Sequence, residues 1–263
     1  MLESRCYFAE VSAEPRRALV ALATLMSRIT IIETGLVRER NRERHGSYPQ
    51  MFQRMIRAAD ASIDFDVVSI VNGVPLPNPD TLQAILITGS SAGVYDKLDW
   101  IAPLEDFVRA AYASHIPMVG VCFGHQLMAQ ALGGTVRKSG KGWGIGRHVY
   151  DIAPGNGVIE GERIAIAASH QDQVIEPPPG ARTILSSSFT EHAGLLYANG
   201  AALSVQPHPE FDTGYALVCC ELREGHAPDA LVAQAKASLA EPVDNARLGG
   251  AITRFLKQGV RAT

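Results

Sequence analysis

Short apolar runs alternate with helix-like segments through the first half of the sequence, and this alternation constrains the fold most strongly. Four runs rich in apolar residues have the composition of strands: residues 28–35, 65–71, 84–88 and 117–121. Three segments between and after them are predicted helices: residues 48–59, 100–114 and 125–132. Because strands that alternate with helices build a sheet covered on both faces, we predict a doubly wound, mostly parallel α/β fold.

The pattern changes after Gly133 and Gly134, which have the character of a helix C-cap. Several short strand-like pieces follow, separated by Gly and Pro clusters: residues 147–151, 164–167, 183–187 and 194–197. They predict an antiparallel meander laid against the main sheet. Residues 202–206 form another predicted strand, and the remainder is expected to be helical, including residues 217–222 and 230–239. The charged residues 37–45 fit a solvated loop or the start of a helix.

Residues 28–263 contain no internal repeat and no low-complexity linker, so we expect them to form one domain. Residues 1–27 are predicted to be an extension, poorly ordered or loosely helical. Its apolar residues 18–25 follow two arginines and have some likeness to a signal peptide, but they are few and lead directly into the first strand. We therefore favour Met26 as the natural start over export.

Composition excludes several classes of function. The formal net charge is −3, which does not fit a nucleic-acid-binding surface, and no apolar run is long enough to span a membrane. The four cysteines are Cys6, Cys122, Cys219 and Cys220; they form no C-x-x-C pair and no disulfide framework. We therefore expect a cytoplasmic protein that uses no metal and no cofactor, with Cys219 and Cys220 packed in the core.

One cysteine has the setting of a nucleophile. Gly120, Cys122 and Gly124 form the pattern G-x-C-x-G between the fourth strand and the following helix. In such a nucleophile elbow, a sharp strand-to-helix turn lifts the side chain above the carboxyl end of the sheet, and the small flanking residues permit close approach. The helix N-terminus favours the thiolate. Most free cysteines are simply small core residues, but the two glycines at this junction favour a nucleophile.

A candidate acid/base pair follows the last strand, in residues 205–211. Residues two apart in extended backbone point to the same side, so His208 and Glu210 can lie next to each other. A thiolate nucleophile requires such a histidine, oriented by a third group. By itself the segment also fits a proline-rich loop with a solvated histidine. Together with the elbow, it predicts a triad of Cys122, His208 and Glu210.

These two segments together resemble the class I (triad) glutamine amidotransferases, and within that family the GMP-synthase-like stand-alone proteins. The likeness extends to three further segments: residues 88–90, 141–146 and 169–174. It covers roughly residues 29–211 and implies the flavodoxin-like fold of that family. It also implies that Cys122 attacks the γ-carbonyl of glutamine to give a γ-glutamyl thioester, that His208 carries the proton to the leaving ammonia, and that Glu210 orients His208.

The resemblance implies contacts to the substrate as well. Backbone N–H groups of Gly89, or its neighbour Ser90, and of Phe123 would form the oxyanion hole. The residues implied to hold the glutamine are Gln126, Ser169, His170 and Gln171. Each has a plainer alternative: residues 89–93 fit an ordinary turn, residues 141–146 a hairpin turn, and His125 and His170 a structural role. A phosphate loop is disfavoured because residues 89–93 lack the lysine of a Walker motif.

Three functions remain open at this point. The first is a stand-alone hydrolase acting on glutamine or on a γ-glutamyl amide or peptide. The second is a glutaminase subunit that delivers ammonia to a separate synthetase, since no ATP-using domain follows Phe211. The third is a non-catalytic regulatory protein, which the complete triad disfavours. A small-molecule substrate is expected for the first two.

Overall fold

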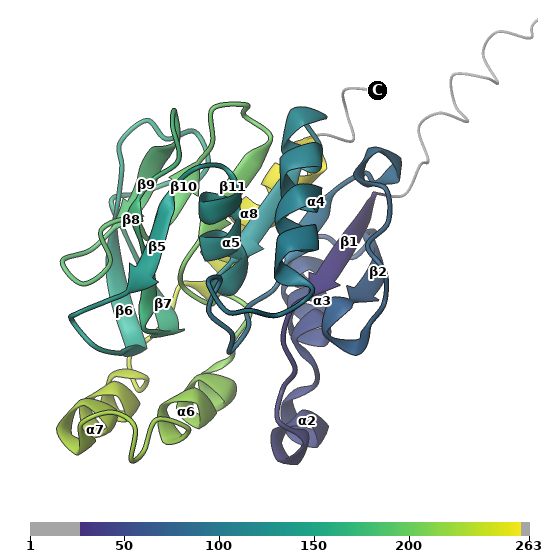
Figure 1. Cartoon of the computed structure of the whole chain (residues 1–263). Coiled ribbons are helices and arrows are strands. Elements are labelled where there is room, and N and C mark those ends of the chain that lie inside the picture. Colours follow the sequence, from purple (N-terminus) through teal and green to yellow (C-terminus); the bar gives the residue numbers. More distant parts are fainter. Residues whose placement is uncertain (1–26, 259–263) are drawn as a thin grey trace, which may run out of the picture.

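The computed structural model describes residues 27–258 of the 263-residue chain (Figure 1). The predicted extension at residues 1–27 therefore lies outside the described residues, except for Ser27. The strands are β1 (Arg28–Glu33), β2 (Asp64–Ser69), β3 (Ile85–Ile87), β4 (Met118–Val121), β5 (Thr135–Lys138), β6 (Gly144–Ile152), β7 (Arg163–His170), β8 (Asp172–Glu176), β9 (Arg182–Ser186), β10 (Gly194–Leu196) and β11 (Ala202–Val205). The helices are α2 (Glu39–His45), α3 (Tyr48–Ala59), α4 (Ile101–Ala113), α5 (Phe123–Ala131), α6 (Thr213–Glu221), α7 (Asp229–Ser238) and α8 (Asn245–Gln258).

A nine-stranded sheet forms the centre, in the order β2-β1-β3-β4-β11-β10-β9-β6-β7. The strands from β2 to β11 are parallel, and those from β11 to β7 pair in antiparallel fashion. The predicted antiparallel strands therefore extend the edge of the main sheet instead of packing on its face. The predicted α/β class is confirmed, with a mostly parallel sheet and an antiparallel addition.

Helices cover both faces of the parallel half (Figure 1). On one face, α3 and α8 pack against each other and bury residues such as Phe52 and Ile252 over β1 and β4. On the other face, α4 and α5 bury Leu104 and Leu127. Strands β1, β3 and β4 supply apolar side chains to both clusters because alternate residues point to opposite faces. This burial explains the nearly continuous apolar runs in the sequence.

Two strands were absent from the sequence prediction. β5 and β8 form a separate two-stranded sheet. β5 is short, and Val136 is its one buried residue, so it lacks the apolar signal of a strand. β8 follows β7 after a single residue, Gln171, so the sequence shows no turn signal between the two strands. The helix predicted from His125 begins earlier, at Phe123, directly after the cysteine.

The carboxyl ends of β1, β3, β4 and β11 lie at one edge of the sheet because these strands are parallel. Helices α2, α6 and α7 lie beyond this edge, at the bottom of Figure 1. α6 and α7 pack with Ile145 of β6 in a third apolar cluster. Within the described part of the chain, no helix combines the length and apolarity needed to cross a membrane.

Candidate active site

Cys122 lies at the turn between β4 and α5, where its backbone adopts φ 54° and ψ −103°. A residue with a Cβ holds such angles only where the surrounding structure enforces them. The enforcement is close backbone packing. A Cβ added to Gly120 would lie 2.4 Å from the carbonyl oxygen of Gly124, and one added to Gly124 would lie 2.4 Å from that of Ile87. The two glycines thus let β3, β4 and α5 approach closely enough to fix the turn.

His208 and Glu210 follow β11. Nδ1 of His208 and Oε1 of Glu210 are 2.8 Å apart, and both side chains are almost fully buried. Since an ionised carboxylate only accepts hydrogen bonds, Nδ1 carries the hydrogen and Nε2 is left for a second partner. A Cβ added to Gly89 would lie 3.2 Å from Cε1 of His208 and 3.6 Å from Cβ of Cys122. The imidazole and the cysteine therefore both border Gly89.

Opposing effects act on the pKa of His208. Burial disfavours the charged ring and lowers the pKa, whereas the charges of Glu210 and Cys122, and hydrogen bonds to both, raise it. The raising effects prevail, so the pKa lies above its ordinary value. Phe211 stacks on the imidazole with ring centroids 4.0 Å apart and planes 6° apart. The site can therefore hold an imidazolium in a fixed plane next to Glu210 and Cys122.

Backbone N–H groups of Gly89, Ser90 and Phe123 are available next to the thiol. None of the three donates to a backbone acceptor within residues 27–258. For Phe123 this is expected, because the N–H groups in the first turn of a helix have no acceptor within the helix. The carbonyl oxygen of Gly89 accepts from the hydroxyls of Thr34 and Thr88, at 3.2 and 3.1 Å. Because a trans peptide directs its N–H opposite to its C=O, the N–H of Ser90 points away from these two hydroxyls.

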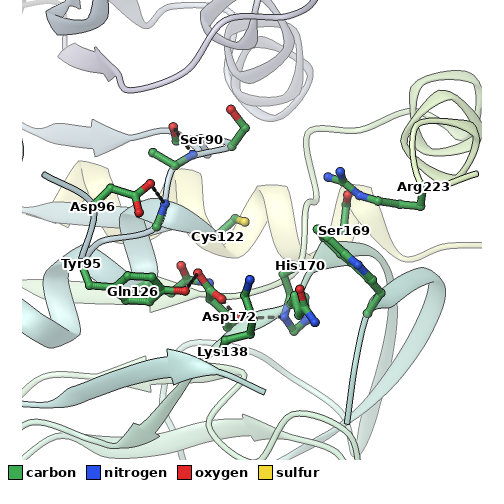
Figure 2. Close-up of a pocket in the computed structure, with 15 residues that line it drawn as sticks. Ser90, Tyr95, Asp96, Cys122, Gln126, Lys138, Ser169, His170, Asp172 and Arg223 are labelled. Atoms are coloured by element: carbon green, nitrogen blue, oxygen red, sulfur yellow. Dashed lines mark hydrogen bonds between the residues drawn. The ribbon is translucent and has the colours of Figure 1, made fainter. Parts of the chain in front are cut away.

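A cavity of about 310 Å³ opens next to Cys122 (Figure 2). Its volume lies at the small end of ligand cavities, roughly 300–1,000 Å³. The loop after β3, the start of α5, the ends of β5, β7 and β8, and the turn after α6 form its wall. The predicted site residues that line it are Cys122, Ser90, Gln126, Ser169, His170 and Gln171. His208 and Glu210 are not part of this wall; they lie buried next to Cys122.

Two of the predicted substrate contacts are already engaged with protein atoms. Nε2 of Gln126 donates to the carbonyl oxygen of Asp172 at 2.9 Å and to Oε1 of Gln206 at 3.0 Å. Its own Oε1 is therefore what it can offer a ligand. Nδ1 of His170 donates to the same carbonyl oxygen at 3.1 Å. Burial, followed by the charges of neighbouring histidines, lowers the pKa of His170 to about 3, so its ring is neutral at pH 7.

Other cavity residues were missed by the sequence prediction. The hydroxyl of Tyr95 donates to Oδ2 of Asp172 at 2.8 Å, while Oδ1 of Asp172 is buried and has no partner within the described residues. Lys138 pairs with Asp172 in the β5–β8 ladder. Arg223 enters the wall from the turn after α6. Asp172 could have been found, because it lies in the family-like segment 169–174, whereas the other three belong to no motif.

Other candidate groups have structural surroundings. Nδ1 of His125 lies 2.7 Å from Oγ of Ser204, and burial lowers the pKa of this fully enclosed ring to about 3. Cys219 and Cys220 are buried in α6, which confirms their predicted core packing. Among residues 27–258, no three His, Cys, Asp or Glu side chains gather as a metal site requires.

Comparison with known proteins agrees with this fold. A family model described as glutamine amidotransferase class-I matches residues 45–216. The chain is 31% identical over 182 residues to a putative glutamine amidotransferase-like protein of Schizosaccharomyces pombe, covering 66% of this chain and 72% of the relative. It is 26% identical over 246 residues to gamma-glutamyl peptidase 4 of Arabidopsis thaliana, covering 86% of this chain and 89% of that one.

Longer relatives and solved structures add to this. The match to the GMP synthase of Thermus thermophilus is 36% identical over 132 residues and spans 49% of this chain but 24% of the relative's length. The crystal structure of a glutamine amidotransferase from Thermotoga maritima superposes with a TM-score of 0.71 at 19% identity, covering 90% of this chain and 99% of that chain. The structural likeness shows the fold.

Proposed function

Because the chain belongs to the class I glutamine amidotransferase family, we propose that it hydrolyses the γ-amide of glutamine, or a similar γ-glutamyl amide, through a thioester on Cys122. The observation that carries this proposal is the placement of a strained, elbow-held cysteine next to a buried histidine–carboxylate pair. A nucleophile, a base and a group that orients the base are the three parts that such acyl transfer needs.

The proposed reaction has two halves. Sγ of Cys122 bonds to the γ-carbonyl carbon, and the thiol proton passes through Nε2 of His208 to the nitrogen as the C–N bond breaks. Ammonia or an amine leaves, and a γ-glutamyl thioester remains. Water then attacks the thioester carbon while His208 accepts its proton; the C–S bond breaks, and the thiol and glutamate are released. Glu210 keeps the hydrogen of His208 on Nδ1 throughout, which leaves Nε2 for these transfers.

The tetrahedral intermediate carries a negative oxygen that needs N–H donors. We assign this role to the N–H groups of Ser90 and Phe123. Phe123 is the first residue of α5, so its N–H has no acceptor in the helix. The sequence left Gly89 and Ser90 as alternative donors, and the peptide geometry favours Ser90. Two hydroxyls bind the carbonyl oxygen of Gly89, and the N–H of Ser90 points in the opposite direction. Removing one such donor costs about 10²- to 10³-fold in rate in known cases.

The amino-acid end of the substrate carries an ammonium and a carboxylate on one carbon. Asp172 and Lys138 offer opposite charges from adjacent strands. Oδ1 of Asp172 is buried without a partner among the described residues, and an ammonium would satisfy it. In this arrangement Asp172 binds the α-ammonium, Lys138 the α-carboxylate, and Oε1 of Gln126 assists as an acceptor. Ser169, His170 and Gln171 shape the adjoining wall.

A second function is a glutaminase subunit whose ammonia passes to a separate synthetase. It is favoured by the GMP-synthase-like motifs and by the fact that the match covers a quarter of the Thermus enzyme. In that case the same triad performs the same hydrolysis, but turnover depends on the partner. The cytoplasmic location expected from the few cysteines stays a prediction.

The test measures glutamate released by the full chain from glutamine and from a panel of γ-glutamyl amides, with Cys122→Ala as control. Turnover that disappears in Cys122→Ala supports the proposal. If Cys122 is alkylated rapidly but no substrate turns over, the subunit alternative is favoured. If Cys122 is also unreactive toward alkylating agents, and the variant behaves like the wild type, the hydrolytic function is refuted.

A further inference from the structure

Arg223 contributes a cation to the cavity wall that the proposed hydrolysis of glutamine does not use. It lies in the turn after α6, with its guanidinium carbon 4.0 Å above the ring of Trp143. No carboxylate forms an ion pair with it in the described part of the chain, and its Nε is buried without a hydrogen-bond partner there. Buried polar atoms are normally satisfied, so an unpaired guanidinium at a cavity wall indicates a missing anion.

The Arg223 guanidinium remains charged and interacts electrostatically with Cys122. Burial lowers the pKa of Arg223, the charges of Cys219, Tyr48 and Cys122 raise it, and that of Arg38 lowers it. An arginine stays protonated despite such a decrease. Its interaction with Cys122 means that the guanidinium lies within electrostatic range of the proposed scissile bond.

Arg223 lies in a different part of the cavity from Asp172 and Lys138, which we assigned to the amino-acid end of the substrate. In Figure 2, Arg223 and Ser169 lie on one side of Cys122, and Tyr95 and Asp96 lie on the other. Tyr95 is hydrogen-bonded to Asp172, which pairs with Lys138 across the β5–β8 ladder. If Asp172 and Lys138 bind the glutamyl zwitterion, the side with Arg223 is left for the group on the γ-nitrogen.

We propose that Arg223, held over the Trp143 ring, binds a carboxylate on the leaving group, so that γ-glutamyl peptides are preferred over glutamine. The inference rests on the proposed γ-glutamyl hydrolysis. Ammonia, the leaving group of glutamine, carries no anion. An α-amino acid bonded through its nitrogen carries a carboxylate on the next carbon, close to the scissile bond. The planar guanidinium can bind a carboxylate in bidentate fashion, and the cation–π contact with the indole helps to hold it in place.

The experiment compares three substrates in wild type and variants of the full chain: γ-glutamylglycine, γ-glutamylglycinamide and glutamine. The first two differ only in whether the leaving group carries a charged carboxylate or a neutral carboxamide. For the wild type, we expect kcat/KM to be higher for γ-glutamylglycine than for its amide. In Arg223→Gln it should fall about 10- to 100-fold for γ-glutamylglycine, as for a lost charge-assisted hydrogen bond, and less than about threefold for the two other substrates. Arg223→Lys should restore part of the loss because it keeps the charge.

A matched control is Arg182→Gln. Arg182 is exposed at the start of β9, which runs in the same direction as β11, so it lies at the sheet edge remote from Cys122. This variant should leave all three rates unchanged. Lys138→Gln should lower all three rates alike, since every substrate carries the α-carboxylate.

Several results would overturn the inference. If Arg223→Gln lowers all three rates equally, Arg223 binds the α-carboxylate or supports the fold, and the leaving-group subsite does not exist. If it changes none, or if the wild type does not distinguish the glycine from the glycinamide substrate, the subsite is also refuted. Failure of the proposed function itself looks different: no substrate would show Cys122-dependent turnover in any variant.

Discussion

The parallel and antiparallel halves of the sheet supply the cavity in different ways. In the parallel half, β3, β4 and β11 end at one edge, where Cys122 and His208 border Gly89. Backbone contacts at Gly120 and Gly124 fix the turn that carries Cys122. Side chains from the end of β7 in the antiparallel half, from the separate β5–β8 sheet and from the turn after α6 form the rest of the wall. The proposed chemistry is thus built on packed backbone, which tolerates little change. The proposed selectivity depends on side chains that can be exchanged without moving a strand.

The largest effect is expected for Glu210, which is hydrogen-bonded to the proposed base, His208, after β11 in the parallel half. Glu210→Gln removes the carboxylate that fixes the tautomer of His208, so kcat should fall by about 10²- to 10⁴-fold, the usual contribution of acid–base catalysis. The pKa of His208 should also fall, because the charge of Glu210 is among the causes that raise it. The rates follow from glutamate release, and the pKa from an NMR titration of the imidazole protons.

The matched control for this prediction is Glu162→Gln, an exposed carboxylate preceding β7 in the antiparallel half. It should change neither kcat nor the pKa of His208. A Glu210→Gln variant that kept the wild-type pKa of His208 but lost activity would indicate a general structural role, and our assignment of Glu210 as the orienting group would then be wrong.

A smaller effect is expected on stability when a glycine in either half of the sheet is replaced by alanine. A Cβ at Gly120 meets backbone atoms of Gly124 at 2.4 and 2.5 Å, whereas one at Gly194 of β10 meets the side chain of Leu185 at 2.9 Å. Overpacking costs about 1–3 kcal/mol. Gly120→Ala should lie at the upper end of this range or beyond it, and Gly194→Ala at the lower end, measured by urea unfolding.

A second substitution that trims the neighbouring side chain distinguishes crowding by a side chain from crowding by backbone. In a double-mutant cycle with Leu185→Ala, which removes the Cγ and Cδ1 atoms at 3.0 and 3.2 Å, Gly194→Ala should cost less stability than it does in the wild type. Trimming Met128, the side chain next to Gly120, should not rescue Gly120→Ala. Equal losses for both single variants, or rescue of Gly120→Ala, would show that backbone packing is no stricter in the parallel half.

The difference between packed backbone and cavity side chains also explains which features the sequence could predict. The parallel strands and their helices were predictable because burial on both faces imposes continuous apolar runs, as in residues 84–88. The elbow was predictable because close backbone approach requires glycine at 120 and 124. β5 was not, since its residues are mostly charged or half-exposed. Lys138 and Arg223 were not either, because they converge only through tertiary structure and no local spacing marks them.

The smallest predicted effect concerns the strain at the elbow itself. Gly usually destabilises a protein relative to Ala by roughly 0.5–1 kcal/mol, because it loses more conformational freedom on folding. At position 122, φ is 54° and ψ is −103°, angles at which a Cβ is strained by about 1–3 kcal/mol. Ala keeps that strain and Gly relieves it, so the order should reverse: Cys122→Gly should be the more stable variant, by about 1 kcal/mol. Urea unfolding of the two variants measures the difference. If Cys122→Ala is the more stable, the parallel half does not hold its nucleophile under strain, and the backbone contrast between the two halves is weaker than the glycine contacts indicate.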